Sequence, residues 1–258
     1  MTRTAPKIGG MGRLRVGTSG YQYRHWRGVL YPEGLPQREW LPRYARFFDT
    51  VEMNATFYRL PTAVAVERWR SIVPRGFTFA VKGSRYLTHL KRLLDAEAGL
   101  ERFFDPVSHF GAKLGPVLWQ LPPHMKPDLQ RLERFLARLP AGRHAVEFRN
   151  EAWYSEETCD VLERHRAAFC EHDAVRRGPP RLTGSFRYVR FHGTTGRYMG
   201  RYGAAALRPF ASDLLAWTAR GGDAFVYFNN DVGGHAVHDA LALLALVGEE
   251  RPALGASP

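Results

Sequence analysis

The sequence predicts an α/β protein built as a single (β/α)8 TIM-type barrel, and three observations support this. Short runs rich in β-branched and aromatic residues alternate with longer amphipathic stretches almost from end to end. Eight such strand–helix repeats fit between residues 12 and 248. The chain length of 258 residues is usual for one barrel of this type. An open doubly wound sheet is the alternative, but no glycine-rich phosphate-binding motif follows the first strand.

The first half of the chain contains three predicted strands separated by helical stretches. The first strand, at 14–18, precedes a loop rich in Tyr, Trp and Gly. The helix predicted at 36–48 places its large apolar side chains on one face. The next two strands are expected at 50–54 and 77–82, with helices at 63–73 and 90–113, the latter broken near Asp105 and Pro106.

The second half of the chain continues the alternation to residue 247. A strand at 117–120 is closed by Pro122 and Pro123. Pro127 suits the first turn of the next helix, where its missing N–H is not needed. Ser155 is expected to cap the helix between the fifth and sixth strands, and the crossover at 174–186 is expected to be a loop because of its Pro and Gly content. The remaining strands are expected at 144–148, 168–173, 187–192 and 224–229, and the remaining helices at 127–139, 207–219 and 236–247.

Composition narrows the class of protein. No apolar run approaches the roughly 18–20 residues of a membrane span. Two cysteines are too few for a disulfide framework, and their spacing matches no zinc motif. A cytoplasmic location without a membrane partner is therefore expected. The net charge of +12 suggests attraction to anions, nucleic acid among them. Because most basic residues are scattered arginines, a solvated basic surface is the favoured interpretation. Residues 1–11 and 249–258 are expected to be flexible tails.

Seven short motifs occur in order along the chain. They are GTSGY at 17–21, VEMNATFY at 51–58, FAVK at 79–82 followed by Thr88 and His89, QLP at 120–122, VEFR at 146–149 with Trp153, YVRFHG at 188–193, and YFNND at 227–231. Together they resemble the YecE-like family, a bacterial group with a domain of unknown function, over residues 12–247. The resemblance implies a TIM-type barrel and implies no reaction. Asp239 departs from the Asn expected there.

Polar side chains are predicted at the carboxyl ends of seven strands. In a TIM barrel the active site lies at these ends, and alternate side chains of a strand point inward. The expected inward groups are Glu52 and Asn54, Lys82, Gln120, Glu147 and Arg149, Asp173, Arg190 and His192, and Asn229. We therefore expect one polar pocket of mixed charge. The same residues could instead neutralise one another as a structural network, because buried ions must be paired.

Three chemistries fit this set of residues. Two carboxylates, Glu52 and Glu147, are the minimum for a glycosidase, although arginine neighbours would keep both ionised. A divalent metal is the second alternative. Its ligands would come from strands five to eight, one each, but the nearby cations oppose it. That set is Glu147, Asp173, His192 and Asn229.

A site without a metal for an anionic ligand is the favoured chemistry. Arg149 and Arg190 would clamp a phosphate or carboxylate. Lys82 would act as base or Schiff-base nucleophile, with Glu147 or His192 as proton shuttle and Glu52 as a further catalytic carboxylate. The remaining substrate-binding residues are expected to be Asn54, Tyr58, Gln120, Trp153, Asn229 and Asn230. His89 is expected to belong to a helix cap.

The sequence thus favours an enzyme of the lyase, isomerase or hydrolase type that acts on a small anionic or sugar-like substrate. A nucleic-acid-binding or processing protein and a non-catalytic ligand-binding barrel are the alternatives. Nothing in the residues specifies an oligomeric state or a required cofactor.

Overall fold

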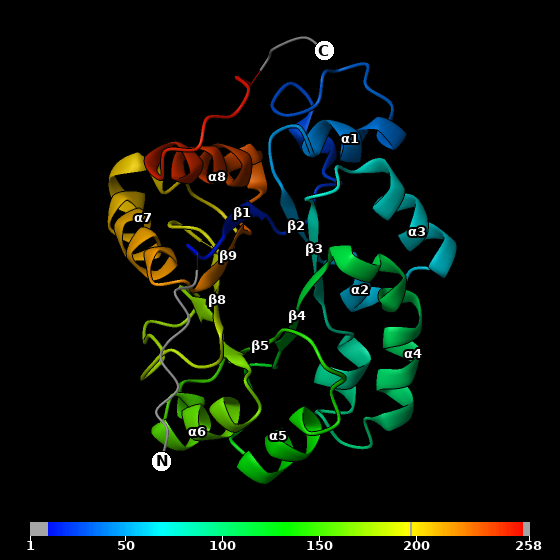
Figure 1. The fold of residues 1–258 in the computed structure, drawn as a ribbon, viewed down its shortest axis with the longest axis vertical. Helices are drawn as coiled ribbons and strands as arrows, with labels where there is room; N and C mark the ends of the chain where they lie inside the picture. The colour runs from blue at the N-terminus through cyan, green and yellow to red at the C-terminus, as the bar shows by residue number, and fades with distance from the viewer. Residues whose placement is uncertain (1–9, 197, 255–258) are drawn as a thin grey trace.

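The strands of the computed structural model, which describes residues 10–196 and 198–254, form two parallel sheets. The first sheet has the order β1 (Leu14–Thr18), β9 (Asp223–Phe228), β8 (Phe186–Phe191) and β7 (Glu171–His172). The second has the order β2 (Thr50–Met53), β3 (Thr78–Lys82), β4 (Leu114–Gln120), β5 (His144–Glu147) and β6 (Ala168–Phe169). Every paired strand is parallel to its neighbour, so all carboxyl ends point the same way. The sheets face each other around a common centre (Figure 1).

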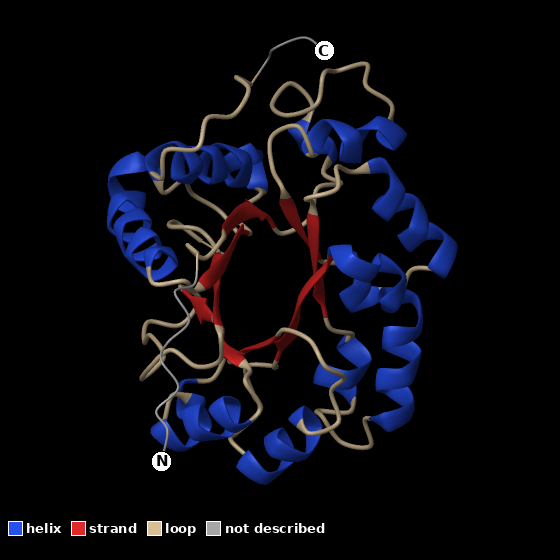
Figure 2. Ribbon diagram, in the orientation of Figure 1, coloured by secondary structure: helices blue, strands red, loops and turns tan. Residues whose placement is uncertain are grey.

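Helices cover the outside of both sheets (Figure 2). The α-helices are α1 (Trp40–Tyr44), α2 (Ala55–Tyr58), α3 (Ala63–Ile72), α4 (Glu97–Val107), α5 (Leu129–Leu136), α6 (Glu156–Arg164), α7 (Gly203–Ala219) and α8 (His235–Leu246). Shorter helical turns are η1 (Arg24–Trp26), η2 (Gln37–Glu39), η3 (Tyr86–Leu90), η4 (Ser108–Lys113), η5 (Glu151–Trp153) and η6 (Val232–Gly234). Among the helices of the described ranges, none is both long and apolar enough to cross a membrane.

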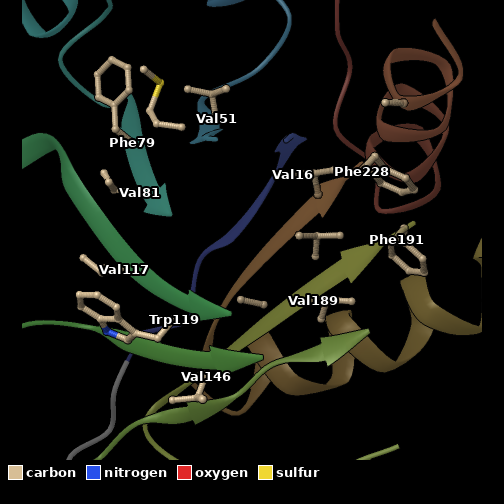
Figure 3. Close-up of a cluster of buried hydrophobic side chains, with 14 of the residues drawn as sticks. Val16, Val51, Phe79, Val81, Val117, Trp119, Val146, Val189, Phe191 and Phe228 are labelled. Atoms are coloured by element: carbon tan, nitrogen blue, oxygen red, sulfur yellow. The ribbon is translucent and has the colours of Figure 1, made fainter. Parts of the chain in front are cut away.

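Two separate hydrophobic clusters follow from the period of two along each strand. The larger cluster joins the outer faces of the strands to the helices, and Figure 3 shows part of it, including Trp119, Val189 and Phe228. The smaller cluster joins strands of both sheets without any helix, and includes Tyr188 and Tyr227. The smaller cluster therefore fills the space between the two sheets, and the outer cluster lies beneath the helices.

A tyrosine hydroxyl joins the two sheets where β1 passes β2. Tyr44 accepts a hydrogen bond from the Thr18 N–H (2.9 Å) and donates one to the Thr50 carbonyl (3.0 Å). Backbone pairing between the two sheets occurs at the ends of β1 and β2, where Ser19 and Glu52 form a parallel β-bridge. Gly17 is required in this seam, because a Cβ atom there would come 2.2 Å from the Thr50 carbonyl oxygen.

We expect Tyr44→Phe to lower the free energy of unfolding by about 2 kcal/mol, since it leaves the buried Thr18 N–H without a partner. Urea denaturation measures this change. Tyr58→Phe is the control, because Tyr58 is 81% exposed. Equal stability of the two variants would show that the seam does not depend on the hydroxyl.

On the opposite side, the chain itself passes from one sheet to the other. The sixth predicted strand is divided at Cys170 into β6, which pairs with β5, and β7, which pairs with β8. The Cys170 N–H still bonds to Val146 (2.9 Å). The Phe169 N–H donates to the Thr183 hydroxyl (2.9 Å). This side chain takes the place of a carbonyl acceptor on a neighbouring strand.

The parallel α/β fold is confirmed, and most element positions agree with the sequence prediction. Ser155 caps α6 by accepting from the Thr158 N–H (3.3 Å), and the described crossover at 174–186 forms no helix. The expected break near Asp105 and Pro106 is confirmed, because α4 ends at Val107, one residue after Pro106. The region predicted as helix at 90–113 contains α4 and η4, and residues 91–96 form no helix.

Of the predicted tails, residues 1–9 and 255–258 lie outside the described ranges. Within the described C-terminal segment, Leu254 packs against the outer hydrophobic cluster. At the other end, the Gly12 N–H bonds to the Thr218 carbonyl (2.8 Å).

Candidate functional site

A buried arginine lies between two buried carboxylates at the carboxyl ends of the strands. Arg190 of β8 donates to Glu52 of β2 (2.8 Å) and to Glu147 of β5 (2.5 Å). All three side chains are fully buried. The triad therefore links both sheets through two ion pairs, as the structural interpretation of these residues expected.

Neighbouring groups occupy the remaining carboxylate positions. Glu52 accepts from the Tyr188 hydroxyl (2.6 Å) and from the Ser19 hydroxyl. Glu147 accepts from Gln120 Nε2 (2.7 Å) and from Arg149 Nε. Each carboxylate thus accepts hydrogen bonds on both of its oxygens.

Glu147 and Arg190 stabilise each other's charged forms. Burial alone would raise the pKa of Glu147, but Arg190 and Arg149 outweigh it and hold the pKa well below its ordinary value. Burial likewise opposes the charge of Arg190, and Glu147 and Glu52 raise its pKa well above the ordinary value. A Glu147 held in this way is a poor general acid, which counts against the glycosidase chemistry.

His192 is held as a neutral imidazole. Its Nε2 accepts from Arg149 Nη2 (2.7 Å), so its Nδ1 carries the proton and donates to Asp173 (3.0 Å). Burial lowers the pKa of His192 to about 4, although the hydrogen bond to Asp173 opposes this. Asp173 also accepts from the Tyr202 hydroxyl. His192 therefore orients Arg149 rather than offering a free lone pair.

Lys82 has no counterion in the described residues. Its side chain, at the end of β3, is 8% exposed, and Nζ lies 4.4 Å from the centre of the Phe57 ring. Among residues 10–196 and 198–254, no carboxylate lies within ion-pair distance of Nζ and no group accepts a hydrogen bond from it. Burial lowers the pKa of Lys82 to about 8; Arg190 and Arg149 act in the same direction, and Glu147 and Glu52 oppose them.

His89 lies beside this amine, which sequence reasoning missed. Its ring packs edge-on against Phe57 (5.0 Å between centres), and Nδ1 bonds to the Thr88 hydroxyl (2.9 Å). Burial and then the charge of Lys82 lower the pKa of His89 to about 4. Its place in the turn after β3, shortly beyond the FAVKGSRY segment, could have been read as a pocket position rather than a cap.

Ser19 is the second residue that sequence reasoning missed. Its hydroxyl donates to Glu52 and accepts from Asn54 Nδ2 (2.6 Å) and Arg190 Nη2 (3.2 Å). The first strand was expected to deliver no polar group, but Ser19 has the same parity as the inner Gly17. The GTSGY motif at 17–21 contains Ser19, so its position on the inner face could have been predicted from the sequence.

Two predicted substrate-binding residues, Trp153 and Asn230, lie in the core. Trp153 is fully buried, stacks on Phe148 and donates to a backbone carbonyl, so a ligand cannot reach its ring. Asn230 is buried and donates to Asp239 (2.8 Å). Tyr58 is exposed, and its ring is in edge contact with Phe57. Arg190 cannot clamp a ligand, because its charge is already paired.

Asp239, the departure from the family pattern, has a structural role. Its carboxylate accepts from the backbone N–H groups of Tyr202 (3.0 Å) and Gly203 (3.1 Å) at the start of α7. A negative charge is favourable at a helix N-terminus, where N–H groups lack partners.

The residue set predicted as the metal alternative is not suited to a metal. The atoms of Glu147 and His192 that would bind a metal instead accept hydrogen bonds from Arg149 and Arg190. A divalent cation at this position would be repelled by the two guanidinium groups. Within the described ranges no group of three or more His, Cys, Asp or Glu residues is gathered in a ligand arrangement. Asn229, the fourth member of the set, is buried, and its side chain makes no hydrogen bond to any described group.

Three arginines of the segment 181–190, which contribute to the net positive charge, are paired within the fold. Arg181 pairs with Glu156 (3.0 Å) and Asp160 (2.5 Å). Arg187 pairs with Glu171 (2.7 Å) and Asp213 (2.6 Å). Arg190 is buried and paired as well, so the charges of these three arginines are balanced by carboxylates of the same chain.

The protein is therefore a parallel α/β protein whose charged side chains form a polar site at the carboxyl ends of the strands. The chain belongs to the family described as "Protein of unknown function DUF72", whose model matches residues 15–258. The YecE-like resemblance of the seven motifs is thereby confirmed.

Two curated relatives and one solved structure are similar to this chain. UPF0759 protein YunF of Bacillus subtilis (strain 168) is 27% identical, over 84% of this chain and 90% of the relative. UPF0759 protein YecE of Escherichia coli (strain K12) is 31% identical over 45% of this chain and 43% of the relative. The crystal structure of a DUF72 family protein from Thermotoga maritima is similar, with a TM-score of 0.82 and 29% identity over 92% of this chain and 100% of the other.

Proposed function

We propose that the two sheets are halves of one (β/α)8 barrel, and that the pocket at their strand ends is the active site of an enzyme. Its substrate is a small anionic or sugar-like compound, and Lys82 is its reactive group. The observation that carries the proposal is the buried amine of Lys82 without a counterion.

Barrel closure is supported at both seams between the sheets. Tyr44 and the Ser19–Glu52 bridge join β1 to β2. Residues 168–172 pass from the second sheet to the first in one continuous chain. Arg190 and its two carboxylates span the centre. A closed barrel requires contacts of this kind around its whole circumference.

An anionic ligand would supply the charge that Lys82 lacks. The triad with Arg149 contains two carboxylates and two guanidinium groups and is neutral by itself. Lys82 is then one positive charge in excess, in surroundings where an unpaired ion is costly. Arg149, 18% exposed, is close enough to lower the pKa of Lys82. Among the described groups, its Nη1 donors have no partner and can join Lys82 in binding a carboxylate or phosphate.

The amine has the properties of a nucleophile near neutral pH. With a pKa of about 8, roughly one tenth of Lys82 is uncharged at pH 7. The neutral nitrogen can add to a carbonyl carbon, and loss of water then forms an imine, with His89 Nε2 as a nearby proton acceptor. An imine accepts electrons from a neighbouring C–C or C–H bond, so lyase or isomerase chemistry fits better than hydrolysis.

Pyridoxal 5′-phosphate is a suitable probe, because it carries both an aldehyde and a phosphate. Borohydride reduces the imine it forms to a stable secondary amine, which peptide mapping locates. The chain has only five lysines, at positions 7, 82, 91, 113 and 126. We expect Lys82 to be labelled at least about tenfold faster than the others at pH 7, with a rate that rises with pH and levels off above about 8.

Lys82→Met should remove the fast label and Lys113→Met should leave it unchanged. Lys113 is the control because its amine donates to the carbonyls of Arg70 and Val73 (2.7 Å each). Labelling spread evenly over the lysines, or retained in Lys82→Met, would refute the proposed role of the amine.

A further inference from the structure

A cavity of about 450 Å³ lies between α1 and α3, which are neighbours on the outside of the strands (Figure 1). Its walls come from the loop after β1, from η2 and α1, and from α3. We propose that this cavity binds the phosphate group of a small phosphate monoester, at a place separate from the active site proposed above. Neither Lys82 nor Arg149 lines it.

The hydroxyl of Tyr21 is a hydrogen-bond donor without a partner in the fold. Tyr21 is 4% exposed, and its side chain belongs to the outer hydrophobic cluster. No described group forms a hydrogen bond with the hydroxyl, and it is not one of the unpaired polar atoms that the fold covers completely. The small accessible part of Tyr21 therefore includes its oxygen. Because packing already holds the ring, a ligand gains this hydrogen bond at little cost in side-chain freedom.

The Arg68 guanidinium acts on the same hydroxyl. Burial raises the pKa of Tyr21, and the charge of Arg68 opposes that rise, so the two groups lie close enough to interact. Both residues line this cavity. Tyr21 also borders a smaller cavity of about 220 Å³ at the ends of β1 and β2, but Arg68 does not. The hydroxyl therefore faces the larger cavity, and it stays protonated at neutral pH and can donate there.

The charge of Arg68 is available to a ligand. Its side chain is exposed, and no described carboxylate lies within ion-pair distance of it. An arginine fork and a fixed hydroxyl that interact with each other can bind one anion together.

The other polar groups of the cavity are also donors or cations. None of the described residues that line it is an aspartate or a glutamate. Arg38 supplies a second guanidinium, paired only with the exposed Glu39 (3.5 Å), and Gln22 and Gln37 supply side-chain amides. Thr62 caps the start of α3 in the same wall, and a helix N-terminus favours negative charge.

The shape of the cavity favours a phosphate that carries an apolar group. A phosphate accepts hydrogen bonds from several directions, which suits donors that come from separate elements of the fold. Leu41, Trp69 and Ile72 also line the cavity and provide apolar contacts. The volume lies in the range of small-molecule sites, so a phosphate does not fill it alone.

Isothermal titration calorimetry with phenyl phosphate, inorganic phosphate and benzoate tests the proposal. We expect phenyl phosphate to bind at least about tenfold more tightly than inorganic phosphate, because its ring is removed from water beside Trp69. Benzoate should bind more weakly than phenyl phosphate, because it offers fewer acceptors and less charge. Lys82→Met should leave the affinity for phenyl phosphate unchanged.

Two variants locate the binding. Tyr21→Phe should raise the Kd for phenyl phosphate about fivefold, and Arg68→Met should raise it at least about tenfold. Tyr58→Phe and Arg102→Met are the matched controls and should change nothing, because both residues are exposed and neither lines the cavity. Tyr21→Phe should leave Tm unchanged to within about 1 °C, because the hydroxyl has no partner to lose.

Each contrary result has a definite meaning. Unchanged Kd values in both cavity variants, or no binding of any compound, overturn the proposal. A larger fall in Tm for Tyr21→Phe shows that the hydroxyl stabilises the fold and is not a free donor. Benzoate binding as tightly as phenyl phosphate overturns the assignment to phosphate. Binding that is lost in Lys82→Met and kept in Arg68→Met belongs to the active site instead. A short oligothymidylate that displaces phenyl phosphate at a lower concentration overturns the assignment to a small molecule.

Discussion

Replacing Arg190 by Met should destabilise the protein by about 3–5 kcal/mol, or to the point of unfolding. The substitution leaves Glu52 and Glu147 fully buried with their principal counterion removed. Their remaining donors, Ser19, Tyr188, Gln120 and Arg149, do not restore that charge between the sheets. Chemical denaturation measures the loss.

Two further variants show whether charge is the cause. Arg187→Met should cost much less. Arg187 lies on the same strand, but it faces outward and pairs with Glu171 and Asp213, which water can reach. The triple variant Glu52→Gln, Glu147→Gln, Arg190→Met should recover much of the stability, because it buries no ion of the triad. A triple variant as unstable as Arg190→Met would indicate that packing, not charge, is decisive.

Replacing Lys82 by Met should increase the free energy of unfolding at pH 7 by about 3 kcal/mol. This difference follows from a pKa of about 8 for Lys82 in the folded protein, against 10.5 for an ordinary lysine. Below pH 8 both states bind the proton, and the folded state alone carries the cost of the buried charge. Methionine fills a similar volume without that charge.

The pH dependence has a definite sign. Between pH 8 and pH 10.5 the unfolded chain keeps the Lys82 proton and the folded protein has lost it, so stability rises with pH in this window. The rise should be absent in Lys82→Met, and the two proteins should converge near pH 10.5. Parallel curves with no gap at pH 7 would mean that the amine carries no uncompensated charge.

The stability lost by burying the charge of Lys82 indicates that this residue has a role in function. Lys82 is a cation without an ion pair, while Glu52, Glu147 and Arg190 at the same strand ends are paired. Residues that lower stability in this way are concentrated at binding and catalytic sites.

The sequence alone was sufficient for the parallel α/β class and for the inner position of most site residues. Strand runs and helix periodicity are local patterns, and the period of two along a strand assigns Glu147 with Arg149 and Arg190 with His192 to one face. The same rule would have included Ser19, had the strand been followed one residue further. The assignment of the chain to its family rests on seven motifs that are likewise local.

Only the tertiary structure decided which of these residues are paired. Arg149 and Arg190 have the same character in the sequence, but Arg190 lies between carboxylates 43 and 138 residues away, while Arg149 remains partly exposed. Trp153 resembled a rim aromatic and is a core residue. The isolation of Lys82 and the unpaired hydroxyl of Tyr21 are likewise invisible in the sequence. Both depend on which side chains from distant segments lie within a few ångströms, and a local pattern carries no information about that distance.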